Sequence, residues 1–148
     1  MGVTLDAGSL TVYQKCLEQR SHPLKEHIAT WMRNKILLST PSAAWAEYWR
    51  GRGPNQHFIA KIRQYVTVNS VSQDTAEFAA DALRRWPRHH NRNSVKHLID
   101  SIVLAHANET GDVIYTTDVE DFKILWDYFP QVKALVSAIS GEVIRKRY

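Results

Sequence analysis

Acidic side chains in this sequence stand where apolar segments end or where apolar neighbours surround them. Asp6 closes the segment "GVTLD", and Asp118 follows "VIYTT". Asp100 interrupts "HLIDSIVLA", and Glu47 lies in the aromatic segment "AAWAEYWRG". Burying an unpaired carboxylate is costly, so such a group needs a partner or a proton. If the fold brings these four acids together, a divalent cation is the partner that relieves their mutual repulsion.

A carboxylate cluster of this kind has a specific chemistry. Mg²⁺ and Mn²⁺ prefer oxygen ligands, and Mg²⁺ binds through a few carboxylates together with a phosphate group and several waters. A bound ion polarises a phosphodiester and activates water for in-line attack, so no histidine or serine nucleophile is required. Each acid also has a purely structural explanation. The alternatives are helix capping for Asp6 and Asp118, an ion pair of Glu47 with Arg50, and an ion pair of Asp100 with Lys96.

The segments that would position these acids alternate between strand-like and helical patterns. Apolar or β-branched runs predict strands at residues 2–6, 35–40, 66–71, 113–115 and 132–139. Helical spacing predicts helices at residues 10–19, 24–33, 41–51, 55–65, 72–86, 94–111 and 119–129, with Ser72 as an N-cap and Gly111 as a stop. This alternation predicts an α/β fold with a mainly parallel central sheet and helices on both faces. In such a sheet ligands bind along the edge formed by the carboxyl ends of the strands, where Asp6 and Asp118 are expected.

Composition narrows the class of protein. The chain has 148 residues, of which 44% are hydrophobic, and this suits one domain with a packed core. The longest apolar runs, such as "SIVLAHA", are too short to cross a bilayer, and "MGVTLDAGSL" lacks the pattern of a signal peptide. The single cysteine, Cys16, cannot form an internal disulfide. We therefore expect one domain over residues 1–148, in the reducing cytoplasm and not in a membrane.

The net charge of +4 is a modest basic excess, but its distribution is uneven. The stretch "RRWPRHHNRNSVKH", residues 84–97, contains five basic side chains and three histidines, and "WRGR" and "RKRY" add more. Trp49 and Trp86 lie among these basic residues and could stack on nucleic-acid bases. The alternative is an ordinary solvated loop and tail.

The motifs named above resemble those of a known family. The order "VTLDAGSL", "PSAAWAEYWRG" and "HLIDSIVLAHANETGDVIYTTDVEDFKIL" is similar to a PIN domain, in particular a VapC-type toxin ribonuclease of bacterial toxin–antitoxin pairs. The last segment is the most specific, because it has an acid, an apolar helix with alanines, a glycine, an apolar strand and then Thr116, Asp118 and Asp121. The likeness covers most of the chain and is weakest at residues 55–93. The first motif departs from the common Asp-Thr-Asn form, because Ala7, Gly8 and Ser9 follow the aspartate.

The resemblance implies a Mg²⁺- or Mn²⁺-dependent endoribonuclease. By motif, the metal ligands and catalytic acids would be Asp6, Asp100, Glu47 and Asp118. Residues of a second tier would be Asp121 as a further acid, Thr116 as a positioning residue and Ser9 as a hydroxyl near the metal. Contacts to RNA or to an antitoxin are expected from Arg50, Arg85, Arg88 and Arg92. Members of the family are usually homodimers that a VapB-type antitoxin neutralises.

Other functions remain open at this point. A housekeeping PIN nuclease in RNA processing would share the acidic motifs without being a toxin. A catalytically silent nucleic-acid-binding module would show binding that depends steeply on salt, but no metal-dependent cutting. A receiver module is less well matched, since it needs paired acids after the first strand and Asp6 stands alone.

Overall fold

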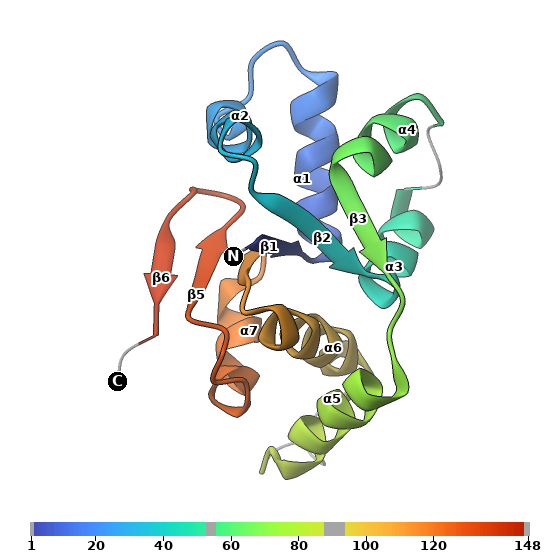
Figure 1. Cartoon of the computed structure of the whole chain (residues 1–148), viewed down its shortest axis with the longest axis vertical. Coiled ribbons are helices and arrows are strands. Elements are labelled where there is room, and N and C mark those ends of the chain that lie inside the picture. Colours follow the sequence, from blue (N-terminus) through green and yellow to red (C-terminus); the bar gives the residue numbers. More distant parts are fainter. Residues whose placement is uncertain (1, 53–55, 88–93, 147–148) are drawn as a thin grey trace.

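One six-stranded sheet forms the centre of the molecule in the computed structural model, which describes residues 2–52, 56–87 and 94–146 (Figure 1). The strands are β1 (Gly2–Leu5), β2 (Leu37–Pro41), β3 (Val66–Asn69), β4 (Val113–Thr116), β5 (Ala134–Ser137) and β6 (Val143–Arg145). Their order is β3-β2-β1-β4-β5-β6. The first five strands run parallel, and β6 pairs antiparallel with β5 at one edge.

Helices cover both faces of this sheet. They are α1 (Ala7–Glu18), α2 (Lys25–Arg33), α3 (Ser42–Arg52), α4 (Gln56–Tyr65), α5 (Gln73–Arg85), α6 (Ser94–Thr110) and α7 (Val119–Leu125), which a 3₁₀ turn, η2 (Trp126–Tyr128), continues. The buried residues form two clusters, one on each face of the sheet. The predicted α/β architecture is therefore confirmed. Within the described part of the chain, no helix combines the length and the apolar character needed to span a membrane.

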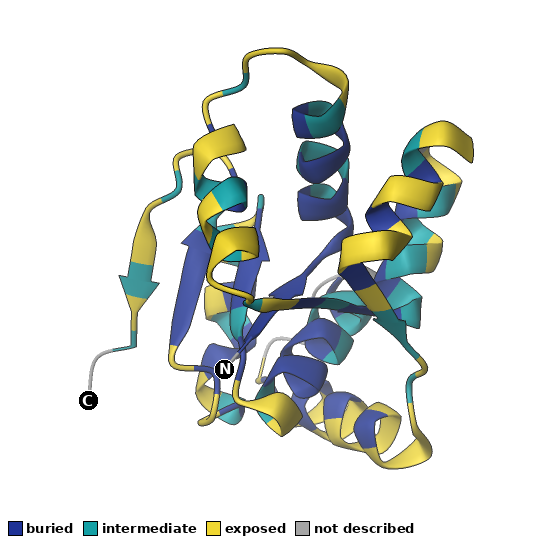
Figure 2. Ribbon diagram, turned by 45° about the horizontal axis from the view of Figure 1, so that its top comes forward, coloured by how far each residue is buried: buried dark blue, intermediate teal, exposed yellow. Residues whose placement is uncertain are grey.

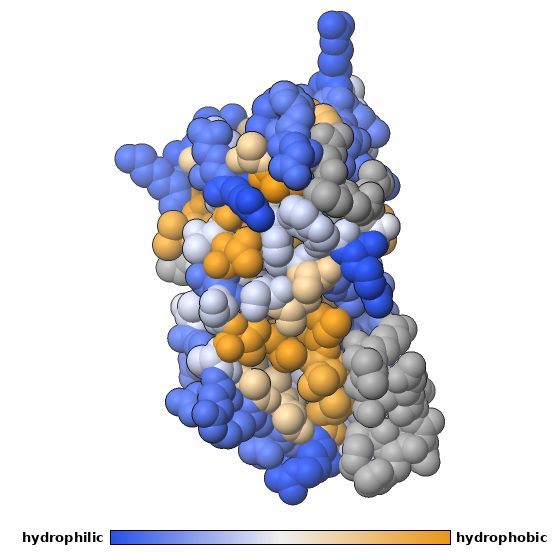
Figure 3. Space-filling view, turned by 90° about the vertical axis from the view of Figure 1, so that its right-hand side faces the viewer, coloured by the Kyte–Doolittle hydropathy of each residue, from blue (hydrophilic) through white to orange (hydrophobic). Residues whose placement is uncertain are grey.

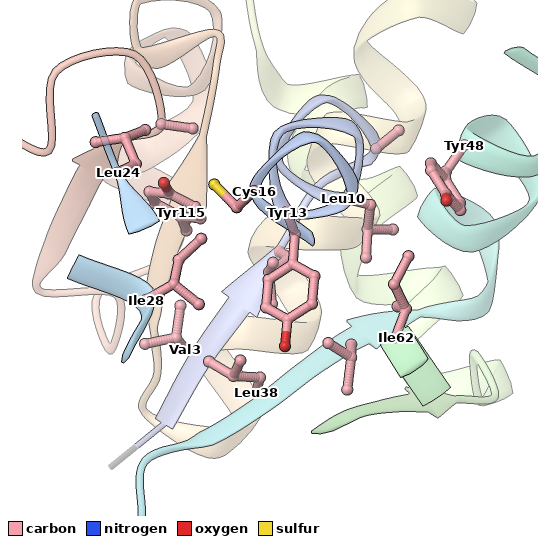
Figure 4. Close-up of a cluster of buried hydrophobic side chains, with 14 of the residues drawn as sticks. Val3, Leu10, Tyr13, Cys16, Leu24, Ile28, Leu38, Tyr48, Ile62 and Tyr115 are labelled. Carbon is pink, nitrogen blue, oxygen red and sulfur yellow. The ribbon is translucent and has the colours of Figure 1, made fainter. Parts of the chain in front are cut away.

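The first cluster fills the space between the sheet and helices α1, α2 and α4. Leu10 and Tyr13 of α1, Ile28 of α2 and Ile62 of α4 all turn toward the strands, where they meet side chains such as Val3 (Figure 4). Successive residues of a strand point to opposite faces, so Val3 faces this cluster while Thr4 faces the other side. Burying such a side chain contributes about 1.5–3 kcal/mol, so this layer fixes α1 firmly on the sheet.

The second cluster lies on the opposite face, under α6 and α7, with α5 packed on α6. Leu104 of α6 and Phe122 of α7 are fully buried with Ile114 of β4. Figure 2 shows that the central strands and the inner sides of the helices are buried, while the edge strand β6 and the outer sides of the helices are largely exposed. Helix α3 joins the two layers, because Ala44 belongs to this cluster and Tyr48 to the first.

Most local sequence signals are found where they were predicted. Ser72 caps α5 by accepting a hydrogen bond from the Thr75 amide, and Gly111 ends α6 with a φ of 70°. Helix α1 begins at Ala7, three residues before the predicted start, because the Asp6 side chain caps it. Strand β6 was not predicted. Its three residues, two of them exposed, carry too little apolar pattern to be recognised.

The strand order fixes where a ligand site can form. Connections from β1 lead outward to β2 and β3 on one side, whereas β4 and β5 lie on the other side of β1. The order therefore reverses between β1 and β4, and in open parallel sheets the crevice at such a switch point is the usual place for ligands. Asp6 follows β1 directly, and Thr117 and Asp118 follow β4.

The opposite end of β1 is held by a buried acid that the sequence did not single out. The two oxygens of Asp112 accept hydrogen bonds from the Gly2 amide at 3.0 Å and from the Thr4 hydroxyl at 2.9 Å. A side chain on Gly2 would have its Cβ only 2.8 Å from the Leu37 carbonyl oxygen, so glycine is required for this close approach. The two hydrogen bonds of Asp112, which we call the Asp112 latch, thus tie the start of β4 to the start of β1.

We expect Asp112→Ala to lower the free energy of unfolding by about 2–4 kcal/mol, because two buried donors would lose their acceptor. Urea unfolding followed by circular dichroism measures this change. The exposed Asp127 provides a control, since Asp127→Ala should cost less than about 0.5 kcal/mol. Equal stability of the two variants would show that the Asp112 latch does not hold β1 in place.

Candidate active site

Asp6 lies at the switch point and is held by hydrogen bonds. Its Oδ1 accepts from the Ser9 amide at 2.8 Å and from the Ser9 hydroxyl at 2.6 Å, and its Oδ2 accepts from the Thr116 hydroxyl at 2.5 Å. The capping role considered as an alternative is therefore real, because Asp6 is the N-cap of α1. Capping does not exclude a second role, since each carboxylate oxygen has two acceptor positions.

Ser9 and Thr116 connect Asp6 to strand β4. The Thr116 hydroxyl donates to Asp6 and accepts from the Asp118 amide at 2.9 Å. The Ser9 hydroxyl contacts both Asp6 and the carbonyl oxygen of Tyr115, although it has a single proton to donate. Both hydroxyl groups are fully buried. The two residues therefore fix the orientation of the Asp6 carboxyl group and link it to the backbone that leads to Asp118.

Burial raises the pKa of Asp6 from 3.8 to about 6. Hydrogen bonds from Ser9 and Thr116 lower the pKa, and the charge of Asp118 raises it, but loss of water is the largest effect. A carboxyl group with this pKa is partly protonated near neutral pH in the absence of a cation.

Asp100 shows where the acids gather. Its pKa rises from 3.8 to about 7, first because of burial and then because of the charges of Asp6, Asp121, Glu47 and Asp118. Helix α6, which carries Asp100, packs against β1, α3 and α7, the elements that carry or directly adjoin those four acids. The fold thus brings five carboxylates from four distant parts of the sequence into one electrostatic neighbourhood.

The remaining alternatives for these acids can be compared with the structure. Asp118 is at the N-cap position of α7, but its exposed side chain makes no capping hydrogen bond there. Within the described residues no ion pair joins the half-buried Glu47 to Arg50. The side chain of Lys96, proposed as the partner of Asp100, lies outside the described residues.

The set of donors fits a hard divalent cation by its chemistry, since every member is a carboxylate or a hydroxyl oxygen. In residues 2–52, 56–87 and 94–146, however, no three acidic, histidine or cysteine side chains are arranged closely enough to hold a metal ion as they stand. Mg²⁺ commonly binds through one or two direct carboxylates and several waters, so direct ligation by all five acids is not needed. Asp6 is buried, and burial is the largest cause of the raised pKa of both Asp6 and Asp100, so these two acids are the best suited to direct ligation.

The arginines predicted to contact RNA or an antitoxin do not share one environment. Arg50 is exposed, and the guanidinium of the exposed Arg85 lies 5.3 Å from the centre of the Tyr128 ring. Arg88 and Arg92 lie outside the described residues. On the side of the molecule where α3, α4 and α5 lie, apolar side chains of the described residues gather between hydrophilic ones (Figure 3).

The prediction that Trp86 stacks on bases is wrong. Trp86 is only 7% exposed and packs edge-on against the His97 ring at 5.1 Å, because α5 and α6 pack closely together. Trp49 is half-buried, and the guanidinium of Arg63 lies 5.8 Å from its ring. Neither ring is a free platform for a base.

Sequence reasoning missed His97 and Thr117 at this site. The His97 Nδ1 is 3.7 Å from Asp100 Oδ2, and His97 is buried. Its position three residues before Asp100 in a predicted helix was an available signal, because residues three apart share one helix face. Thr117 gave no such signal, since its position depends on packing against α1.

Comparisons with known proteins give a limited result. No family model and no curated protein matches the chain. One similar solved structure is described as "Structure of FitAB bound to IR36 DNA fragment". The match has a TM-score of 0.48 and 15% sequence identity, and it covers 83% of this chain and 90% of that chain. This likeness concerns the path of the backbone, and we assign no residue role from it.

We expect the free energy of unfolding of the metal-free protein to fall as the pH rises from 3.8 to about 7. The folded state keeps a proton on Asp100 that the unfolded chain has already released, so raising the pH favours unfolding. Asp100→Asn cannot lose this proton and should be more stable than the wild type at pH 8, by on the order of 2–4 kcal/mol.

Denaturant unfolding at several pH values in EDTA measures this effect, with Asp127→Asn as the exposed control. Asp6, Glu47, Asp118, Asp121 and His97 also face Asp100 and are unchanged in both proteins. Identical pH profiles for the wild type and Asp100→Asn would contradict a buried and crowded Asp100.

Proposed function

We propose that this protein is a Mg²⁺- or Mn²⁺-dependent endoribonuclease with a PIN-like fold, which hydrolyses phosphodiester bonds of RNA. The observation that carries the proposal is the gathering of carboxylates around Asp100 at the switch point of the sheet. The charges of the surrounding acids raise the pKa of Asp100, and this crowding is unfavourable for folding alone. A divalent cation turns the same arrangement into a favourable one.

The surroundings of each acidic side chain suggest its role in binding the cation. Asp6 is fixed in orientation by Ser9 and Thr116, so it offers a preorganised oxygen to a cation. Asp100 approaches from α6 and lies among negative charges that help to raise its pKa to about 7. The same negative charges attract a divalent cation, which takes the place of the Asp100 proton. Glu47 and Asp118 are more accessible and are suited to hold waters of the ion.

A bound ion would supply charge neutralisation for the phosphodiester and an activated water at this site. The protein itself positions the acids, and it keeps bulk water away from Asp6, which is only 6% exposed. The exposed Arg50 lies on α3, the helix that carries Glu47, and it is our candidate for a contact to the RNA backbone.

We expect the purified protein to cut single-stranded RNA when Mg²⁺ or Mn²⁺ is present, and EDTA to stop the reaction. Asp6→Asn and Asp100→Asn should each reduce the cleavage rate by at least about 100-fold, a typical effect of removing one preorganised charged or polar group. Gel analysis of a labelled RNA measures these rates.

Asp127→Asn is the matched control, because it also removes one carboxylate but lies exposed in η2. Unfolding measurements show whether each variant is folded, and Asp100→Asn is expected to be at least as stable as the wild type. Wild-type rates in both Asp6→Asn and Asp100→Asn would overturn the proposed mechanism.

The finer proposal follows from the resemblance in sequence motifs. The protein would be the toxin of a VapBC-type pair, acting as a homodimer and neutralised by a VapB-type antitoxin. We expect expression of the wild-type chain in a bacterial host to arrest growth and Asp6→Asn not to do so. Normal growth with an RNA-cutting protein would favour a housekeeping nuclease instead.

A further inference from the structure

A pocket lies next to the acidic cluster, where strands β4 and β5 end. Its volume is about 300 Å³, and its walls include Thr117, Asp118, Glu120, Asp121, Ser137 and Ile139. Two of these acids belong to the cluster around Asp100, so the pocket opens beside the place where a phosphodiester would be cut. A group that enters it would therefore be close to the scissile phosphate.

Thr117 reaches its position only because residue 8 is glycine. A Cβ atom on Gly8 would overlap the Thr117 hydroxyl and would lie 3.2 Å from the Thr117 Cβ. The departure from the Asp-Thr-Asn form of the first motif thus has a physical consequence. The space that a side chain at residue 8 would fill is occupied by the hydroxyl group of Thr117, which follows the neighbouring strand β4.

The Thr117 hydroxyl is available to a ligand. No hydrogen bond joins it to any residue that the structure describes, and the side chain is half-buried. Its neighbours are already engaged, because the Thr116 hydroxyl binds Asp6, and the Ser137 hydroxyl oxygen accepts from the Ile139 and Ser140 amides at 3.2 Å each. Thr117 therefore lines the pocket and carries a hydroxyl group, packed against Gly8, that has one donor and free acceptor capacity.

The chemistry of the walls restricts what can bind. Carboxylates repel a phosphate that carries no cation, so the pocket favours a neutral group with hydroxyl or amine donors. A ribose has such a group in its 2′-hydroxyl. Hydrolysis by an activated water does not use the 2′-hydroxyl, so this group is free to serve as a contact by which a protein tells RNA from DNA.

We propose that the Thr117 hydroxyl, placed beside the acidic cluster by Gly8, binds the 2′-hydroxyl of a nucleotide next to the scissile phosphate. This inference rests on the proposed function and names a residue that determines RNA specificity. Because a ribose hydroxyl is both donor and acceptor, it can use both capacities of Thr117.

The experiment compares one RNA cut by the wild type with the same strand carrying a single 2′-deoxy nucleotide on either side of the mapped scissile bond. We expect the wild type to cut one of the two deoxy strands about 3- to 10-fold more slowly, which corresponds to one hydrogen bond. Thr117→Val should cut the RNA as slowly as that deoxy strand and should show no further loss on the deoxy strand.

Thr117→Ser keeps the hydroxyl and should restore the discrimination. Thr67→Val, an exposed threonine of β3 outside the site, is the matched control and should behave like the wild type. Fluorescence anisotropy with the same strands in EDTA provides a second readout, in which Thr117→Val should lose the difference in affinity between the RNA and deoxy strands.

The outcomes separate this inference from the proposed function. Undiminished discrimination by Thr117→Val would overturn the role of Thr117, and equal cutting of RNA and both deoxy strands by the wild type would overturn the 2′-hydroxyl contact. In both cases the nuclease proposal would stand. A wild type that cuts no RNA with Mg²⁺ or Mn²⁺ would overturn the proposed function and this inference together.

Discussion

The structure depends on one buried carboxyl group at the end of the central strand β1. Asp6 ends β1, caps α1 and receives the hydroxyl group of Thr116 from the neighbouring strand. A single side chain therefore sets the start of a helix, the alignment of two strand ends and the orientation of an acid at the switch point. Its pKa near 6 results from opposing effects, because burial disfavours the charged carboxylate whereas the hydrogen bonds favour it.

The two edges of the sheet use acids in opposite ways. At the amino edge Asp112 satisfies two buried donors and supports the fold. At the carboxyl edge Asp100 is surrounded by other carboxylates, whose charges oppose its ionisation. Placing unfavourable charges at one end is tolerable because the two apolar layers over the sheet provide the stability of the whole molecule. Functional sites often retain such unfavourable groups, at a cost in stability that the rest of the fold offsets.

The sequence predicted the elements with long periodic patterns and the parallel sheet that they imply. It also placed Asp6 and Asp118 at the correct edge, because strand ends can be read from short apolar runs. It did not predict β6, the burial of Trp86 or the Asp112 latch, since these depend on contacts between distant segments. The motifs suggested that Glu47 and Asp100 act together. The effect of the Glu47 charge on Asp100, however, depends on the packing of α3 against α6, which the sequence does not show.

The amino edge supports folding, whereas the carboxyl edge carries the crowded acids. This separation has a consequence for how such a protein can evolve. Loss of the Asp100 carboxylate at the carboxyl edge relieves repulsion and leaves the Asp6 cap, the Asp112 latch and both apolar layers untouched. An inactive descendant would keep its shape and any surface by which it meets other molecules. This architecture can therefore give rise to folded binding proteins that have lost their chemistry by a single substitution.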